Sequence, residues 1–181
     1  ISGHKFSQVV GYTGKVSRED LKDEYYFPTD VIGRLGIEAE YEKYLRGQHG
    51  NIFISRGESD YIIKEASPGK SVVTNLDRDL QIKLYDETFT VLRDSGLARA
   101  VAIIQNPNNG EVLALVSFPD FDNNIFSSGV SGDDYRRLFE NKSKPLFNRA
   151  ISGLYNPGST IKPLMGMMAL EEKIMSPEDT I

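Results

Sequence analysis

The sequence predicts an α+β fold in which helices pack on an antiparallel sheet, and three observations support this prediction. Apolar residues recur at helical spacing over residues 78–94. Two nearly continuous apolar runs, 100–105 and 111–118, flank a segment rich in Asn, Pro and Gly that is typical of a hairpin turn. A third apolar run, 164–170, follows residues that are typical of a helix start. Helices and strands in this order favour helices on one antiparallel sheet over a parallel α/β arrangement.

Composition narrows the function classes. The 181 residues are 39% hydrophobic and 26% charged, as in folded proteins. The net charge of −5 and the lack of Lys/Arg clusters with interleaved aromatics argue against a nucleic-acid partner. With no cysteine, and with His4 and His49 far apart, we expect neither a metal site nor a cofactor.

No apolar run approaches the eighteen residues of a membrane span, so no segment of the sequence is expected to cross a membrane. The chain opens on Ile1 without a methionine and stops at Ile181 directly after a polar segment. We therefore expect a piece of a longer protein, with a membrane anchor before it and more of its second domain after it.

The first part of the chain is predicted to contain several short helices and strands. A capping-box pattern opens a helix over 17–26, and apolar spacing predicts a second helix over 37–46. Two β-rich runs, 51–56 and 61–65, form a hairpin. A Ser-Pro-Gly break follows at 67–69, and we place a domain boundary there, which gives a first domain of residues 1–66 and a second of 67–181.

Within the second helix of the first domain, glutamates alternate with apolar residues. Glu38, Glu40 and Glu42 lie on its polar side. We interpret them as solvated charges rather than as an acid/base pair.

The second domain begins with a predicted strand, 71–76, and a long helix, 78–94. Asp77 is placed to cap the helix start and Gly96 to end it. An apolar stripe on this helix, typical of core packing, comprises Ile82, Tyr85, Phe89 and Leu92.

Because both hairpin strands are almost wholly apolar, we expect both faces of the hairpin to be covered. Residues 118–132, with Pro119 and several Asn, Ser and Gly, predict a loop, and 133–140 predicts a short helix.

The candidate catalytic residues are Ser159 and Lys162. Residues three apart on a helix share one face, so a neutral lysine amine could reach the serine oxygen and take its proton. Pro157-Gly158 breaks the preceding structure, Ser159 and Thr160 are good capping residues, and an apolar helix that we expect to be buried follows. A nucleophile at the end of a buried helix is well placed for chemistry.

The S-x-x-K pattern alone is short, and a second copy, Ser67 to Lys70, contains Pro-Gly and reads as a loop. Ser159 could equally be an ordinary capping serine beside a solvated lysine. Four sequence motifs that follow one another along the chain favour the catalytic interpretation, namely 106–117, 119–122, Asn148-Arg149-Ala150 and 157–163.

Those four motifs resemble the N-terminal part of the transpeptidase domain of penicillin-binding proteins. Residues 11–16 and 33–47 resemble the pedestal, or dimerisation-type segment, of class B members, most closely the elongation type, the penicillin-binding protein 2 group. The resemblance covers nearly the whole chain: 1–66 is similar to part of the pedestal and 67–181 to the incomplete N-terminal part of the transpeptidase domain.

The resemblance implies a peptidoglycan D,D-transpeptidase on the periplasmic side of the bacterial membrane, anchored by a transmembrane helix. Ser159 is then the nucleophile, Lys162 its base and the Ser159 backbone N–H an oxyanion donor, and β-lactams acylate the same serine. Its implied partners are the peptidoglycan stem peptide, a SEDS-type lipid II glycosyltransferase and elongation scaffold proteins.

The sequence departs from the family pattern because S-x-N and K-[ST]-G occur nowhere in it. We therefore expect these residues alone to be inactive, and to need the missing C-terminal part of the same transpeptidase domain. Two other interpretations remain open: a β-lactamase or β-lactam sensor, and a non-catalytic interaction module for a cell-wall glycosyltransferase. For Asn148 and Arg149 we expect a structural role, tying the loop before Ser159 to the sheet.

Overall fold

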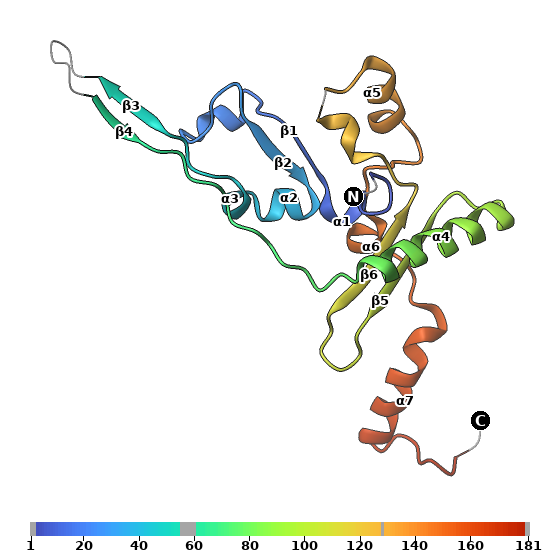
Figure 1. The fold of residues 1–181 in the computed structure, drawn as a ribbon. Coiled ribbons are helices and arrows are strands. Elements are labelled where there is room, and N and C mark those ends of the chain that lie inside the picture. Colours follow the sequence, from blue (N-terminus) through green and yellow to red (C-terminus); the bar gives the residue numbers. More distant parts are fainter. Residues whose placement is uncertain (1–2, 55–60, 128, 180–181) are drawn as a thin grey trace.

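The structure is a computed structural model that describes residues 3–54, 61–127 and 129–179 (Figure 1). The predicted α+β class is confirmed, since helices accompany antiparallel strand pairs throughout. In the described residues the strands form three antiparallel pairs, which are β1 (Tyr12–Lys15) with β2 (Val31–Leu35), β3 (Asn51–Ile54) with β4 (Tyr61–Lys64), and β5 (Ala100–Gln105) with β6 (Val112–Phe118).

The long helix α4, Arg78–Ser95, forms as predicted. The Asp77 side chain accepts hydrogen bonds from the first turn, and Gly96 ends the helix in the left-handed conformation with φ 68°. Tyr85 and Leu92 of its apolar stripe, together with Leu84, pack on the β5–β6 hairpin, where Leu92, Val116 and Phe118 form a buried cluster. This cluster is the core of the second part of the chain.

Coverage of the β5–β6 hairpin is less complete than predicted. Ala100 and Ala102 face α4, whereas Ile103 alternates to the other side and stays 46% exposed. On that side lies α6 (Arg149–Ser152), which is a single turn long and packs against both strands. The prediction that both faces are covered is therefore wrong for β5.

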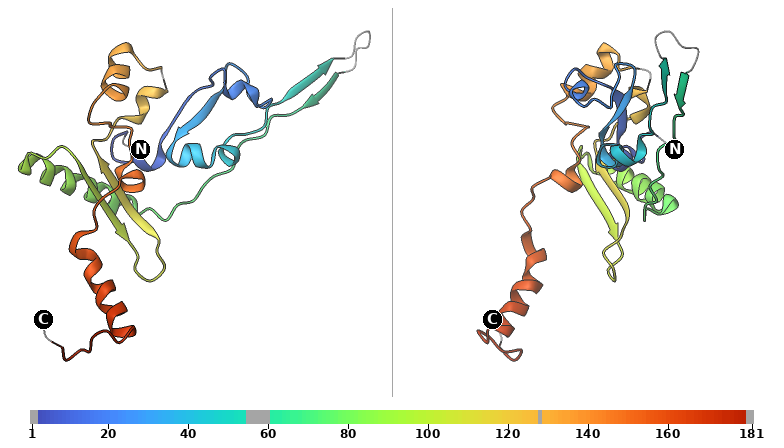
Figure 2. Two further views of the ribbon diagram at one scale, coloured as in Figure 1. Left: turned by 180° about the vertical axis from the view of Figure 1, so that it is seen from behind. Right: turned by 90° about the vertical axis from the view of Figure 1, so that its left-hand side faces the viewer.

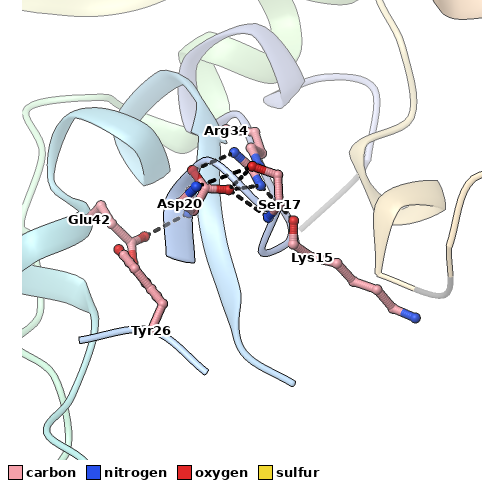
Figure 3. Close-up of polar contacts among 7 residues, drawn as sticks. Lys15, Ser17, Asp20, Tyr26, Arg34 and Glu42 are labelled. Atoms are coloured by element: carbon pink, nitrogen blue, oxygen red, sulfur yellow. Dashed lines mark hydrogen bonds and ion pairs between the residues drawn. The ribbon is translucent and has the colours of Figure 1, made fainter. Parts of the chain in front are cut away.

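The predicted helix over 17–26 is wrong. Only one 3₁₀ turn forms, η1 (Asp20–Lys22), and Asp23 already has an extended backbone. The contacts of Asp20 explain this difference (Figure 3). As in a capping box, the Asp20 carboxylate accepts hydrogen bonds from Ser17 N (2.7 Å) and Ser17 Oγ (2.6 Å). The same carboxylate also accepts two hydrogen bonds from Arg34 of β2 (2.6 and 3.2 Å). This tertiary ion pair holds the turn against the strand and overrides the helical pattern.

The second predicted helix forms in two pieces, α2 (Gly36–Glu40) and α3 (Glu42–Leu45), which are separated at Tyr41 (φ −105°, ψ 16°). Glu42 is not a solvated charge, in contrast to the prediction. Its carboxylate accepts from Tyr26 OH (3.0 Å) and from the backbone N–H of Gly33 (2.7 Å), as Figure 3 illustrates for Tyr26.

The predicted hairpin of this first part is confirmed as the pair β3–β4, and its turn lies outside the described residues. The predicted strand at 71–76 does not form. The segment has no regular structure, Val73 is 93% exposed, and no described strand pairs with it.

A second core cluster joins the two parts of the chain. Phe121 and Phe126, from the predicted loop and its 3₁₀ turn η2 (Asn123–Phe126), pack against Tyr12 of β1 and Leu35 of β2. The Tyr12 and Phe126 rings are stacked with centroids 3.5 Å apart. The division into 1–66 and 67–181 stays a prediction.

The remaining helices are short. The predicted helix at 133–140 forms as α5 (Gly132–Phe139), and a four-residue helix, α1 (Ser7–Val10), precedes β1. No helix in the described ranges is long and apolar enough to cross a membrane. Two elements project from the centre in different directions, the β3–β4 hairpin and the C-terminal helix α7, Lys162–Glu171 (Figures 1 and 2).

Candidate active site

Ser159 and Lys162 lie where a 3₁₀ turn passes into a helix. The turn η3 spans Gly158–Ile161, and α7 begins directly after it, at Lys162. Gly158 has φ 57°, a left-handed conformation that glycine adopts without strain, so the chain can turn sharply after Pro157.

Capping differs from the prediction at this point. Neither η3 nor α7 has a side-chain cap, and the Thr160 hydroxyl donates instead to the carbonyl of Pro157. The reason is that Ile161, and not Ser159 or Thr160, precedes the first residue of α7. In the described structure Ser159 therefore does not serve as the ordinary helix cap that was the competing interpretation.

The backbone places Ser159 and Lys162 on the same side. A 3₁₀ turn has three residues per turn, so side chains three apart lie directly above one another. Both residues are exposed. The Lys162 backbone N–H donates to the Ser159 carbonyl, but neither side chain makes a hydrogen bond or ion pair with a described residue. The turn thus aligns the two residues, while a hydrogen-bonded pair of nucleophile and base stays a prediction.

The helix that carries Lys162 is exposed, and the prediction of a buried helix is wrong for this chain. Its apolar side chains are between 44% and 68% exposed, in Leu164, Met165, Met167, Met168 and Leu170. The helix leaves the rest of the molecule after η3 (Figures 1 and 2), so no described element packs along it. An apolar helix of this kind is stable in a folded protein when its faces are covered.

Asn148 and Arg149 have the structural role expected of them. The Arg149 backbone N–H donates to Ser117 Oγ on β6 (2.9 Å), and Asn148 caps α6 by accepting from the N–H of Ala150 (3.0 Å). The Asn148 amide also donates to the carbonyl of Gln8 (2.9 Å). The segment before Ser159 is in this way tied to the sheet and to the N-terminal residues.

The Arg149 side chain holds the loop in front of α6. Its guanidinium is buried and donates to the carbonyls of Ser143, Lys144 and Phe147. Burial, with the nearby positive charge of Arg99, lowers the pKa of Arg149 below the ordinary arginine value. A guanidinium suits this position because its five donors fan out in a plane.

Sequence reasoning missed two residues of this arrangement, Gln8 and Ser117. The Gln8 amide donates to the carbonyl of Pro145 (2.6 Å) and its side chain is buried. Ser117 is a polar residue inside an apolar run, which is the signal that could have identified it as a buried hydrogen-bonding partner, whereas Gln8 follows another polar residue, Ser7, and carries no such signal.

Comparison with known proteins identifies two matching family models. A family model described as "Penicillin-binding Protein dimerisation domain" matches residues 1–74, and one described as "Penicillin binding protein transpeptidase domain" matches residues 100–181. The chain is 35% identical to the peptidoglycan D,D-transpeptidase MrdA of Haemophilus influenzae, over 99% of this chain and 28% of the relative. The chain thus spans just over a quarter of the length of that relative.

Solved structures of similar proteins show the same fold. The crystal structure of Pseudomonas aeruginosa PBP2 in complex with WCK 5153 matches with a TM-score of 0.76 and 34% identity, over 98% of this chain and 36% of that one. Helicobacter pylori PBP2 matches with a TM-score of 0.73 and 28% identity, over 99% and 34%. This chain belongs to the penicillin-binding proteins of the penicillin-binding protein 2 group, with a dimerisation domain and the first part of a transpeptidase domain.

Proposed function

We propose that this chain supplies the nucleophile of a peptidoglycan D,D-transpeptidase, with Ser159 as nucleophile and Lys162 as its base. The observation that carries the proposal is the position of both residues on one side of the turn that leads from η3 into α7. The names of the relatives support the reaction class.

In the proposed reaction, Lys162 takes the hydroxyl proton of Ser159 while the oxygen attacks the carbonyl between two terminal D-alanines. The C–N bond breaks, the last D-alanine leaves with a proton, and an ester to Ser159 remains. An amine from a second stem peptide attacks this ester, forms the cross-link and returns the proton to Ser159. The Ser159 backbone N–H donates to the oxyanion in both steps.

The exposed apolar side of α7 supports a further part of the proposal. We expect the segment that carries S-x-N and K-[ST]-G, absent from this sequence, to cover α7 and to complete the cleft. Loss of one oxyanion donor alone costs about 10²–10³ in rate, so the 181 residues by themselves are expected to be inactive.

The test uses a polypeptide of the relatives' length that contains these residues, labelled with fluorescent penicillin. Ser159→Ala should abolish covalent labelling, and Lys162→Met should slow it by at least about 10²-fold. Thr160→Val, which changes the neighbouring hydroxyl, is the matched control and should label normally. Continued labelling of Ser159→Ala would falsify the assignment of the nucleophile.

We also propose that residues 1–66 form the pedestal and contact a SEDS-type lipid II glycosyltransferase and elongation scaffold proteins, on the periplasmic face of the membrane. The match of residues 1–74 to a dimerisation domain supports this division and weighs against a β-lactamase or sensor. Co-purification of the glycosyltransferase with Ser159→Ala, but not with protein lacking residues 1–66, is the expected result.

A further inference from the structure

A cleft of about 730 Å³ lies within residues 24–70, on elements that contain neither Ser159 nor Lys162. It is bounded by the loop after η1, by α3, and by the segments on either side of the β3–β4 hairpin. We call it the basic cleft after its four cationic lining residues, which are Lys43, Arg46, Lys64 and Lys70. One carboxylate, that of Glu24, lines it as well.

One wall of the basic cleft is a row of side chains in contact. The Arg46 guanidinium lies 3.8 Å from the centre of the Tyr25 ring, Tyr25 packs on His49 with centroids 4.8 Å apart, and His49 packs on Phe27 at the same separation. The Tyr25 hydroxyl donates to the carbonyl of Gly47 (2.5 Å), which fixes the ring. This wall is therefore formed before any ligand arrives, and that lowers the entropic cost of binding.

Two aromatic rings of the basic cleft remain open to a ligand. Phe27 is 50% exposed and Tyr44 is 57% exposed, although both line a concave surface. Lys70 is held at the rim because its backbone N–H donates to the Tyr44 carbonyl (2.7 Å), and its ammonium lies 5.9 Å from the centre of the Tyr44 ring. The basic cleft therefore presents both exposed aromatic rings and an ammonium group to a ligand.

The cations of the basic cleft are mostly uncompensated. Arg46 lies 3.6 Å from the Asp23 carboxylate, whereas Lys43, Lys64 and Lys70 form no ion pair with the described residues. The whole chain carries a net charge of −5, so this concentration of positive charge is a local feature. With four cations and one carboxylate, that of Glu24, this concave surface carries a net positive charge and attracts an anionic ligand.

We propose that the basic cleft binds an acidic saccharide, whose sugar rings lie against Phe27 and Tyr44 and whose carboxylates contact Lys43 and Lys70. A pyranose ring presents a face of C–H groups that suits an aromatic side chain, and lysine ammonium groups suit carboxylates. The choice of a muramic-acid glycan as this saccharide rests on the proposed function, because muramic acid combines both groups in one residue.

The test measures binding to the 181-residue chain that carries Ser159→Ala, by isothermal titration calorimetry. Three probes separate the contributions: a peptide-free glycan of alternating N-acetylglucosamine and N-acetylmuramic acid, a neutral chitin oligosaccharide of equal length, and a free stem peptide. The acidic glycan should bind with a Kd below about 1 mM, and the other two should bind at least about tenfold more weakly. Binding of the glycan should weaken as salt rises.

Variants locate the site. Lys43→Glu with Lys70→Glu should weaken glycan binding at least about tenfold, and Tyr44→Ala should weaken the acidic glycan and any residual chitin binding alike. Lys83→Glu, a single charge reversal of the same kind on the exposed side of α4, should bind as the parent does. If the double charge reversal perturbs the circular dichroism spectrum, Lys43→Gln with Lys70→Gln replaces it.

Three results would overturn the proposal: no glycan binding at about 5 mM, equal binding of the chitin oligosaccharide or of the stem peptide, or unchanged binding in the double variant. Penicillin labelling at Ser159 is a separate measurement, so failure of the proposed function and failure of this proposal are distinguishable.

Discussion

The Gln81 side chain pairs with the backbone of Leu115 as a neighbouring β-strand would. Its Nε2 donates to the Leu115 carbonyl and its Oε1 accepts from the Leu115 N–H, both at 2.8 Å. The same Nε2 donates to the carbonyl of Lys5 (2.7 Å), and the side chain is fully buried. One carboxamide on α4 therefore satisfies three backbone groups that belong to β6 and to the N-terminal segment.

Gln81→Leu should lower the free energy of unfolding by about 2–4 kcal/mol, because it leaves buried backbone groups unpaired. Urea denaturation followed by circular dichroism measures the change. The matched control is Gln105→Leu, since Gln105 makes one exposed hydrogen bond, to Gly110 O (2.7 Å). A control as destabilised as Gln81→Leu would contradict this explanation.

Arg149→Met should loosen the loop at 141–147 by removing the donors to its three carbonyls, at a cost of about 2–3 kcal/mol. The rates of limited trypsin cleavage after Lys142 should then rise, whereas Lys144 is followed by Pro145 and is not a trypsin site. Arg136→Met removes a guanidinium that is paired at the surface with Asp133 and should leave these cleavage rates unchanged. Equal rates in the two variants would show that Arg149 does not hold the loop.

Asp20 should make the fold sensitive to acid. Hydrogen bonds from Arg34 and Ser17 hold the pKa of Asp20 well below its ordinary value, so the ionised form is favoured in the folded state. Its stabilisation is fully present above the unfolded pKa, about 4, and declines as the pH falls below that value toward the folded pKa.

The measurement is the difference in unfolding free energy between the parent chain and Asp20→Asn from pH 7 to pH 2.5. The difference should shrink below about pH 4. Asp133→Asn removes an acidic group whose side chain is 89% exposed, and it should give a small difference at every pH. If the difference in unfolding free energy between the parent chain and Asp20→Asn stays constant with pH, this explanation is wrong.

Gly11→Ala should destabilise the first hairpin by about 2–4 kcal/mol. Gly11 has φ 82°, and an added Cβ would lie 1.7 Å from the carbonyl oxygen of Leu35. Gly132→Ala is the contrasting change, because a Cβ on this first residue of α5 meets nothing within 4 Å. Thermal unfolding should show a lower midpoint for the first variant and an equal or higher one for the second.

Local sequence signals predicted the elements that depend on local interactions. The helix over 78–94 has its own cap, stop and apolar stripe, and it forms as α4. The pattern over 17–26 has a capping box of equal quality, yet the ion pair between Asp20 and Arg34 limits it to one turn. That ion pair joins residues that are far apart in sequence, so no local pattern could reveal it.

Local sequence patterns predicted the candidate site only in part, for the same reason. Spacing was enough to place Ser159 and Lys162 on one side of a turn, because three residues complete a 3₁₀ turn. Burial of α7 could not be predicted from its apolar composition, since burial depends on what packs against a helix. Gln8 and Ser117 escaped notice because their hydrogen-bonding partners, Pro145 and Arg149, come much later in the chain.

The stacking of Tyr12 on Phe126 has a consequence for synthesis on the ribosome. Strands β1 and β2 leave the ribosome early, but the aromatic rings that cover Tyr12 and Leu35 are made only when Phe121 and Phe126 are translated. Until then the hairpin exposes the apolar side chains of Tyr12 and Leu35, so its burial depends on a segment that comes much later in the chain.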